Sequence, residues 1–184
     1  MTHRAVVSLL DADHEMAVRR IWDRLAGHGL EADLWVTPIP HITYHVAGAY
    51  PDNMVENLSL VAGETRPFRI RTAGLGMFPG ESPVIYLSVV RSEVVDQVHG
   101  RIWESMEHTA DGVNNLYSPP LWVPHITIGQ VRGLGSATVD ALTTVVSDLG
   151  PWEINLAELA VIEGAGPDAR TRARIPFGSI DSEA

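Results

Sequence analysis

The pattern of apolar and polar residues along the chain predicts both strands and helices. Near-continuous runs of valine, leucine and isoleucine over residues 5–10 and 84–90 predict two buried strands. Two-residue alternation over residues 68–72 and 152–156 predicts strands with one apolar face, and a final strand is expected near residues 171–177. Four segments with apolar residues at helical spacing are predicted to form amphipathic helices: residues 13–27, 51–63, 93–108 and 136–149.

These predicted elements occur twice, in the same order. The sequence RIWD at residues 20–23 returns as RIWE at 101–104, and LWV at residues 34–36 returns at 121–123. Matching positions lie 81 to 87 residues apart. A period this long, seen twice, indicates a duplicated half-domain. We therefore expect a single bilobal domain over residues 1–184, built from pseudo-repeats of about 1–80 and 81–184.

The order of elements predicts the fold class. Each half is expected to run strand, helix, histidine-bearing strand, helix, strand. Several connections look too short for the helical crossovers that parallel strands require, so mostly antiparallel pairing is expected. The predicted class is α+β: a bilobal duplicated fold with two mostly antiparallel sheets flanked by helices, a pseudo-two-fold axis and a central cleft.

The tripeptide His-Ile-Thr occurs once in each half, at residues 41–43 and 125–127. Residues two apart in a strand share a face, so His41 projects with Thr43, and His125 projects with Thr127. The isoleucine between them points the other way and can anchor each strand in the core. A pseudo-two-fold axis would bring the two pairs face to face across the cleft.

Two histidines on opposite walls suit in-line displacement at phosphorus. The attacking oxygen loses a proton and the leaving oxygen gains one, and imidazole, which titrates near pH 6.5, can serve either end. The two threonine hydroxyls can donate to the non-bridging phosphoryl oxygens, where charge accumulates. This chemistry requires neither a metal ion nor a cofactor, and we predict none. The sequence leaves open which histidine is the base.

The two histidine segments resemble a known family. HITY at residues 41–44 and HITI at 125–128 are similar to the two H-Φ-[ST]-Φ motifs of the 2H phosphoesterase superfamily, which includes 2′-5′ RNA ligase-like proteins and cyclic nucleotide phosphodiesterases. The resemblance covers most of the chain, including residues 78–80 and the apolar run at 84–90 that follows them.

This resemblance implies a metal-independent hydrolase with one motif in each lobe. It implies that His41 and His125 form the acid–base pair and that Thr43 and Thr127 bind phosphate. The implied reactions are hydrolysis or formation of 2′-linked phosphodiesters, commonly the opening of a 2′,3′-cyclic phosphate, in the context of RNA processing.

Further candidate substrate contacts lie near the two motifs: His45, Phe78, Tyr117 and Trp122. His45 should share the face of His41, with a partly solvated strand end as the alternative interpretation. Phe78, Tyr117 and Trp122 could stack on a base or a ribose. Structural packing is the competing interpretation for Trp122 and for its counterpart in the first half, Trp35.

Other polar side chains carry weaker signals. Arg170, Arg172 and Arg174 alternate along the last predicted strand and indicate either a solvated sheet face or a phosphate-guiding patch. His41 and His45 would lie about 13 Å apart in an extended strand, too far to share a metal ion. The remaining histidines are expected in solvated positions: His3, His14, His28, His99 and His108.

Composition and charge narrow the function classes. With 184 residues, 45% of them hydrophobic and 20% charged, the chain can bury the core of one domain. A net charge of −10 argues against binding long nucleic acid and favours a small nucleotide or an RNA terminus as substrate. The chain contains no cysteine, which excludes disulfides and thiol nucleophiles. No apolar run approaches the roughly 18 residues of a membrane span, so a cytoplasmic protein without membrane contact, by default a monomer, is expected.

Two alternatives to a phosphodiesterase stay open at this stage. One is a non-catalytic protein that binds nucleotides or RNA ends in the same cleft. The other is an enzyme that works in the 2′-5′ RNA ligase direction with the same acid–base pair.

Overall fold

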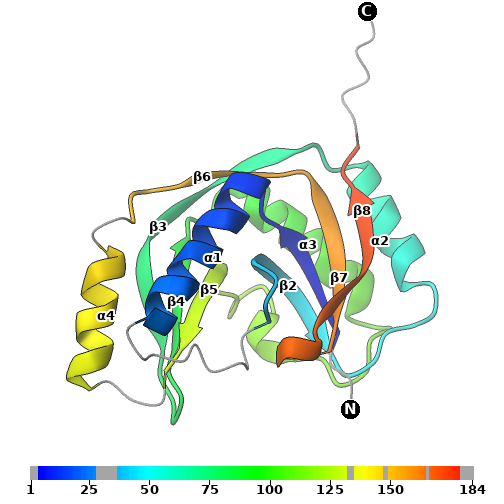
Figure 1. Cartoon of the computed structure of the whole chain (residues 1–184). Coiled ribbons are helices and arrows are strands. Elements are labelled where there is room, and N and C mark those ends of the chain that lie inside the picture. Colours follow the sequence, from blue (N-terminus) through cyan, green and yellow to red (C-terminus); the bar gives the residue numbers. More distant parts are fainter. Residues whose placement is uncertain (1–3, 28–36, 132–134, 147–148, 165, 179–184) are drawn as a thin grey trace, which may run out of the picture.

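Two antiparallel sheets of four strands each form the centre of the molecule (Figure 1). The computed structural model describes residues 4–27, 37–131, 135–146, 149–164 and 166–178. The first sheet has the order β2-β1-β7-β8, formed by His41–Ala47, Arg4–Leu9, Glu158–Glu163 and Arg170–Pro176. The second has the order β5-β4-β3-β6, formed by His125–Gln130, Val84–Val89, Phe68–Phe78 and Glu153–Leu156.

Within the described residues, four helices cover these sheets. The helices are α1 (Ala12–Gly27), α2 (Met54–Gly63), α3 (Glu93–Met106) and α4 (Ser136–Val146). Helices α2 and α3 pack against each other and against the first sheet, whereas α1 contacts α4 and strand β5 of the second sheet. The predicted α+β class, with antiparallel sheets flanked by helices, is confirmed. No helix in the described part of the chain is both long and apolar enough to cross a lipid bilayer.

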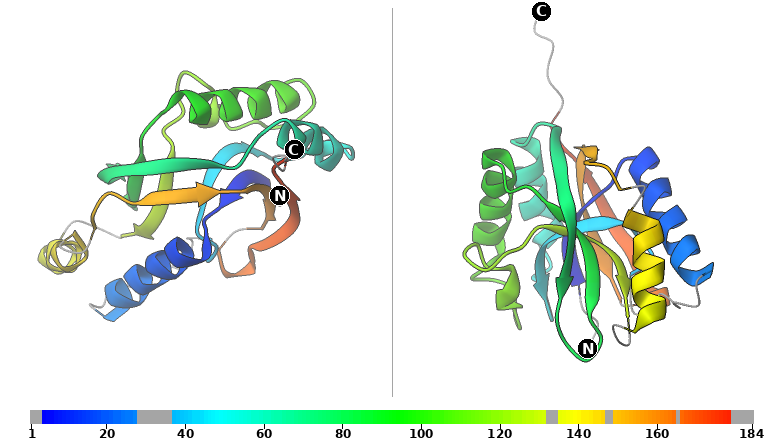
Figure 2. Two further views of the ribbon diagram at one scale, coloured as in Figure 1. Left: turned by 90° about the horizontal axis from the view of Figure 1, so that it is seen from above. Right: turned by 90° about the vertical axis from the view of Figure 1, so that its left-hand side faces the viewer.

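The two halves of the sequence exchange a strand. Strand β3, from the first half, pairs with β4, and β7, from the second half, pairs with β1. Strands β3 and β6 also pair antiparallel, with Ile70 opposite Ile154. These two isoleucines are equivalent positions of the sequence repeat, so the expected pseudo-two-fold axis would pass between them. Figure 2 shows β3 and the β6–β7 segment running alongside each other across the molecule.

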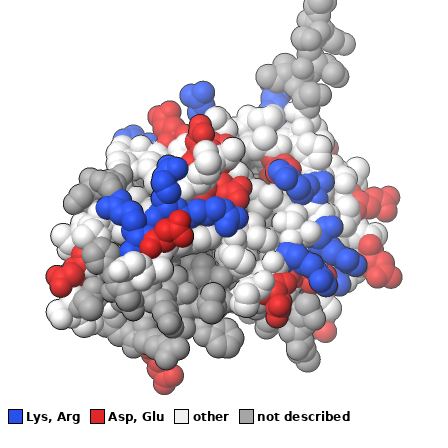
Figure 3. All heavy atoms as spheres, viewed as in Figure 1, with Lys and Arg blue, Asp and Glu red and all other residues white. Residues whose placement is uncertain are grey.

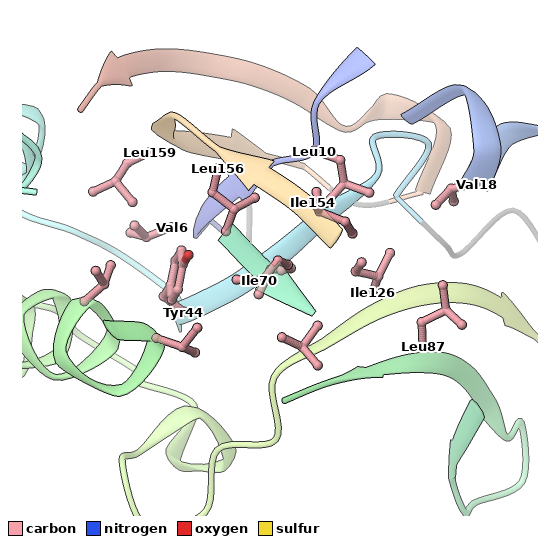
Figure 4. Packing of buried hydrophobic residues seen from close by; sticks show 14 of the residues in the cluster. Val6, Leu10, Val18, Tyr44, Ile70, Leu87, Ile126, Ile154, Leu156 and Leu159 are labelled. Carbon is pink, nitrogen blue, oxygen red and sulfur yellow. The ribbon is translucent and has the colours of Figure 1, made fainter. Parts of the chain in front are cut away.

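Because of this strand exchange, the two sheets share one hydrophobic core. Tyr44 and Ile126, on the histidine-bearing strands, belong to the same buried hydrophobic cluster as Ile70 and Ile154 (Figure 4). Burying apolar side chains from both sheets in one cluster stabilises their relative position. The floor between the two histidine-bearing strands is therefore part of the core.

The strand predictions need two corrections. Strand β3 extends from the predicted residues 68–72 to Phe78, although Gly74 and Gly76 have low intrinsic strand propensity. Pairing with β4 over Gly74–Phe78 overrides that propensity. Strand β7 was not predicted, and it is the continuation of β6 that corresponds to the second half of β3. The matched residues 34–36, Trp35 among them, lie outside the described residues.

Candidate active site

The strands β2 and β5 both begin at a motif histidine, and they contact each other at the junction of the two sheets. A cleft of about 440 Å³ opens there. Its lining includes both pairs from the repeat: His41 with Thr43, and His125 with Thr127. Of the weaker candidates, Phe78, Tyr117 and Trp122 also line this cleft.

The two histidine rings are held in the same way. Nδ1 of His41 lies 2.5 Å from the carbonyl oxygen of Ile39, and Nδ1 of His125 lies 2.7 Å from that of Val123. A carbonyl oxygen can only accept, so each Nδ1 donates its proton, and the ring's Nε2 is the nitrogen left to bind a ligand. Both imidazoles therefore have the same tautomer, with the proton on Nδ1.

The two rings differ in how readily they take up a second proton. Burial, with a smaller contribution from the neighbouring His125, lowers the pKa of His41 to about 4, although the bond to Ile39 opposes the shift. Burial also lowers the pKa of His125, while its bond to Val123 opposes the shift. Because two imidazolium groups repel each other, protonation of one ring disfavours protonation of the other.

Thr43 is held from two sides. The indole Nε1 of Trp122 donates to the Thr43 carbonyl oxygen at 2.9 Å, and the Tyr117 phenol hydrogen-bonds the Thr43 side chain. Trp122 is only 2% exposed and stacks on His99 with ring centroids 3.8 Å apart. Its ring therefore offers little surface for stacking on a base, and its contacts are those of a packing residue that fixes β2.

His125 sits against two aromatic rings. Phe78 meets it edge-on with centroids 4.9 Å apart, Tyr86 lies at 5.2 Å, and Phe78 and Tyr86 stack at 4.3 Å. The Tyr86 ring lies over Gly76, where a Cβ atom would come within 2.4 Å of it. Any side chain at residue 76 would therefore displace Tyr86. The sequence pattern did not indicate Tyr86 or Gly76 as part of the site, because their contact depends on the β3–β4 register.

Comparison with known proteins identifies this arrangement. The family model described as the 2'-5' RNA ligase superfamily matches residues 11–168. The chain belongs to the 2'-5' RNA ligase superfamily. The expected membership of the 2H phosphoesterases is thereby confirmed, and with it the broad class of enzyme.

Solved structures share the fold of this superfamily member. LigT of E. coli, complexed with 3'-AMP, is 17% identical with a TM-score of 0.66, and the match covers 97% of this chain and 99% of LigT. A structure described as a phosphoesterase is 15% identical with a TM-score of 0.63 over 97% and 99% of the two chains. TT0787 of Thermus thermophilus is 16% identical with a TM-score of 0.62 over 96% and 99%. No curated protein sequence matches the chain.

His45 does not lie where the sequence pattern predicts, on the face of His41 or at a partly solvated strand end. It is fully buried, not partly solvated, and it does not line the cleft. The reason is a bulge: Val7 pairs with Thr43 and Val6 with His45, which leaves Tyr44 as an extra residue in β2. The bulge breaks the two-residue alternation and turns His45 under α3, where its ring meets Trp103 at 5.0 Å.

Of the other polar candidates, His99 departs from its prediction, whereas the arginines on β8 fit one of the two interpretations given for them. His99, expected in a solvated position, is 1% exposed, and its Nε2 donates to the Tyr117 carbonyl oxygen at 2.9 Å. Arg172 and Arg174 on β8 form ion pairs with Glu163 and Glu158 on β7. Figure 3 shows blue and red side chains interspersed over this face. The pairing favours a solvated sheet face over a phosphate-guiding patch. No three His, Asp or Glu side chains among the described residues could hold a metal ion together.

The buried His45 predicts acid lability. Burial, with a contribution from His99, lowers the His45 pKa from 6.5 to about 4. The unfolded chain therefore takes up this proton at a higher pH than the folded chain. As the pH falls from about 6.5 towards 4, the free energy of unfolding should decrease by on the order of 2–3 kcal/mol for this group. Urea unfolding at several pH values measures the effect.

A matched pair of variants isolates His45 from the other histidines. His45→Asn retains a polar atom near Nδ1, which lies 2.7 Å from the Tyr50 hydroxyl, and removes the titration. Its stability should depend less steeply on pH than that of the wild type. His108→Asn, at a side chain that is 85% exposed, should leave the dependence unchanged. An unchanged slope in His45→Asn would refute the assignment.

Proposed function

We propose that this protein is a metal-independent phosphodiesterase of the 2H type. Its substrates would be 2′,3′-cyclic phosphates or 2′-5′-linked nucleotides and RNA ends, cleaved by two histidines acting as base and acid. The observation that carries the proposal is that both His-Ile-Thr motifs line one cleft, each with Nδ1 bound to a backbone carbonyl. Both Nε2 atoms are thereby left for substrate.

The proposed roles of the two histidines rest on the difference between their surroundings. Burial keeps His41 neutral, since its pKa is lowered to about 4, and Nε2 of a neutral imidazole can accept a proton. In hydrolysis, His41 takes a proton from the attacking water as a new P–O bond forms. The bond from phosphorus to one ribose oxygen breaks, and His125 donates its Nε2 proton to that oxygen. Exchange with solvent then returns both rings to their starting state.

A bound phosphodiester favours the same division of roles between His41 and His125. Its negative charge raises the pKa of a nearby imidazole, which favours the protonated form of His125 in the complex. The Thr43 and Thr127 hydroxyls donate to the non-bridging oxygens, where negative charge increases in the transition state. With a ribose 5′-hydroxyl in place of the attacking water, the same two proton transfers break the bond from phosphorus to the 3′ oxygen of the cyclic phosphate and join the two ends through a 2′-5′ linkage.

Turnover of nucleoside 2′,3′-cyclic monophosphates in the presence of EDTA tests the proposal. We expect ring opening, with the position of the product phosphate read by phosphorus NMR. Saturable binding by calorimetry without any product would instead favour a non-catalytic binder. Activity that disappears with EDTA and returns with zinc would favour a metallohydrolase. An assay with a 5′-hydroxyl RNA end as acceptor measures the joining direction.

A further inference from the structure

The cleft wall carries no fixed charge in the described part of the chain. Apart from the two histidines, the polar residues that line it are neutral: Thr37, Thr43, Asn114, Tyr117, Thr127 and Gln130. The other lining residues are apolar: Phe78, Val84, Leu116, Leu121, Trp122 and Val123. A charged imidazole is therefore the only cation that this lining can present to an anionic ligand.

Arg91, which contacts the outside of this wall, is already engaged in other interactions. Arg91 lies with its guanidinium 5.8 Å from the Trp122 ring centroid. Its Nε donates to Asp96 at 2.7 Å, and its terminal nitrogens donate to the carbonyl oxygens of Pro119 and Trp122 at 3.3 Å. The ion pair with Asp96 neutralises it, and these bonds brace the outside of the wall. Arg91 is not free to meet a phosphate in the cleft.

One lip of the cleft exposes apolar side chains. Leu116 is 70% exposed, Leu121 is 58% exposed and Val123 is 42% exposed, and all three line the cleft. The segment that carries them is held in place: the Asn114 side chain accepts from the Leu116 backbone amide, and the Leu121 amide donates to the Ser118 carbonyl. Exposed apolar surface beside polar groups suits the face of a ligand with an uncharged ring system.

We infer that the cleft selects short phosphodiesters that carry a single negative charge. Resting on the proposed function, this narrows the substrate class to nucleoside 2′,3′-cyclic phosphates, or 2′-5′-linked dinucleosides, with a free 5′-hydroxyl. One protonated histidine balances the one diester charge, and the apolar lip receives the base. A second phosphate finds no cation in the described lining, and the chain's net charge of −10 repels it further.

Paired substrates test this inference directly. We compare kcat/KM for a nucleoside 2′,3′-cyclic phosphate bearing a 5′-hydroxyl with that for the same compound bearing a 5′-phosphate. The 5′-hydroxyl compound should be preferred by about 10-fold or more at low ionic strength, and added salt should narrow the gap. Equal turnover of both, or a preference for the 5′-phosphate, overturns the inference but leaves the proposed function standing. Turnover of neither compound overturns both.

Substitutions in the cleft lining test whether the absence of a fixed positive charge causes the preference for the 5′-hydroxyl compound. Thr37→Arg and Gln130→Arg each add a cation to the cleft wall. Thr37→Met and Gln130→Met serve as controls of similar length without the charge, and Gln130→Met also loses the side-chain bond to the Ser82 carbonyl. At least one arginine variant should shift the substrate ratio towards the 5′-phosphorylated compound, relative to its methionine control. Identical ratios in all four variants would show that charge does not set the preference, and would overturn the inference.

Discussion

Replacing His41 or His125 with alanine is expected to lower kcat by about 10²- to 10⁴-fold, with each substitution made alone. Each ring supplies one proton transfer, and the described lining of the cleft contains no third histidine and no carboxylate that could replace either ring. Because the two rings act in one step, the double variant should be little worse than either single variant. Initial rates on a nucleoside 2′,3′-cyclic phosphate measure all three.

The pH profile separates the two roles. In the free protein the pKa of His41 is about 4, and burial holds the pKa of His125 below its ordinary value of 6.5. The profile of kcat/KM should therefore be bell-shaped, with its optimum on the acidic side of neutrality. The basic limb of kcat should lie at higher pH, since the bound anion favours the protonated His125. The residual activity of His41→Ala should lose the acidic limb, and that of His125→Ala the basic limb.

An exposed histidine gives the matched control. His108→Ala changes a side chain at the end of α3 that is 85% exposed, and it should keep wild-type rates and the same profile. Thermal melts of all variants check that the fold is retained. Wild-type kcat in either His41→Ala or His125→Ala would contradict acid–base catalysis by this pair. Reversed limbs would keep the pair and exchange the roles.

Strand periodicity accounts for how much of the cleft could be predicted. The two-residue repeat places His41 with Thr43 and His125 with Thr127, and the structure brings all four residues to one cleft. Duplication made this prediction stronger, because both copies had to obey the same rule. The resemblance to the 2H phosphoesterases rested mainly on these same tripeptides.

Side chains whose position depends on pairing could not be read from the sequence. His45 follows the same periodicity, but the bulge at Tyr44 reverses its face, and a bulge depends on how β2 registers with β1. Tyr86 reaches His125 because Gly76 lies opposite it across the sheet. Trp122 stacks on His99 of helix α3, and this contact depends on how the loop after α3 folds back on the helix. Register and exchanged strands are properties of the assembled fold, which local patterns do not contain.

Removing one threonine hydroxyl should slow the reaction without altering the pH profile. Thr43→Val and Thr127→Val keep the side-chain shape and remove a donor to the non-bridging oxygens. A hydrogen bond to a charged group contributes about 1.5–3 kcal/mol, so each variant should lose roughly 10- to 100-fold in kcat. Steady-state kinetics on the cyclic phosphate measure this loss, and unchanged kcat in both variants would refute phosphate binding by these hydroxyls.

A buried threonine outside the cleft controls for stability. Thr72 on β3 accepts the Trp152 backbone amide through its hydroxyl at 2.8 Å and does not line the cleft. Thr72→Val should lower the melting temperature while kcat stays near the wild-type value. If Thr72→Val slowed turnover as much as Thr43→Val, the loss would be a consequence of weakened packing.

The Tyr117 contact allows a sharper version of this test. We expect the hydrogen bond between the Tyr117 phenol and the Thr43 side chain to fix the orientation of the Thr43 hydroxyl in the cleft. Tyr117→Phe should then lower kcat by a smaller factor than Thr43→Val. In the Thr43→Val background the same change should have almost no effect, because there is no hydroxyl left to orient. Independent, additive losses in this double-mutant cycle would mean that Tyr117 acts on the substrate directly instead of through Thr43.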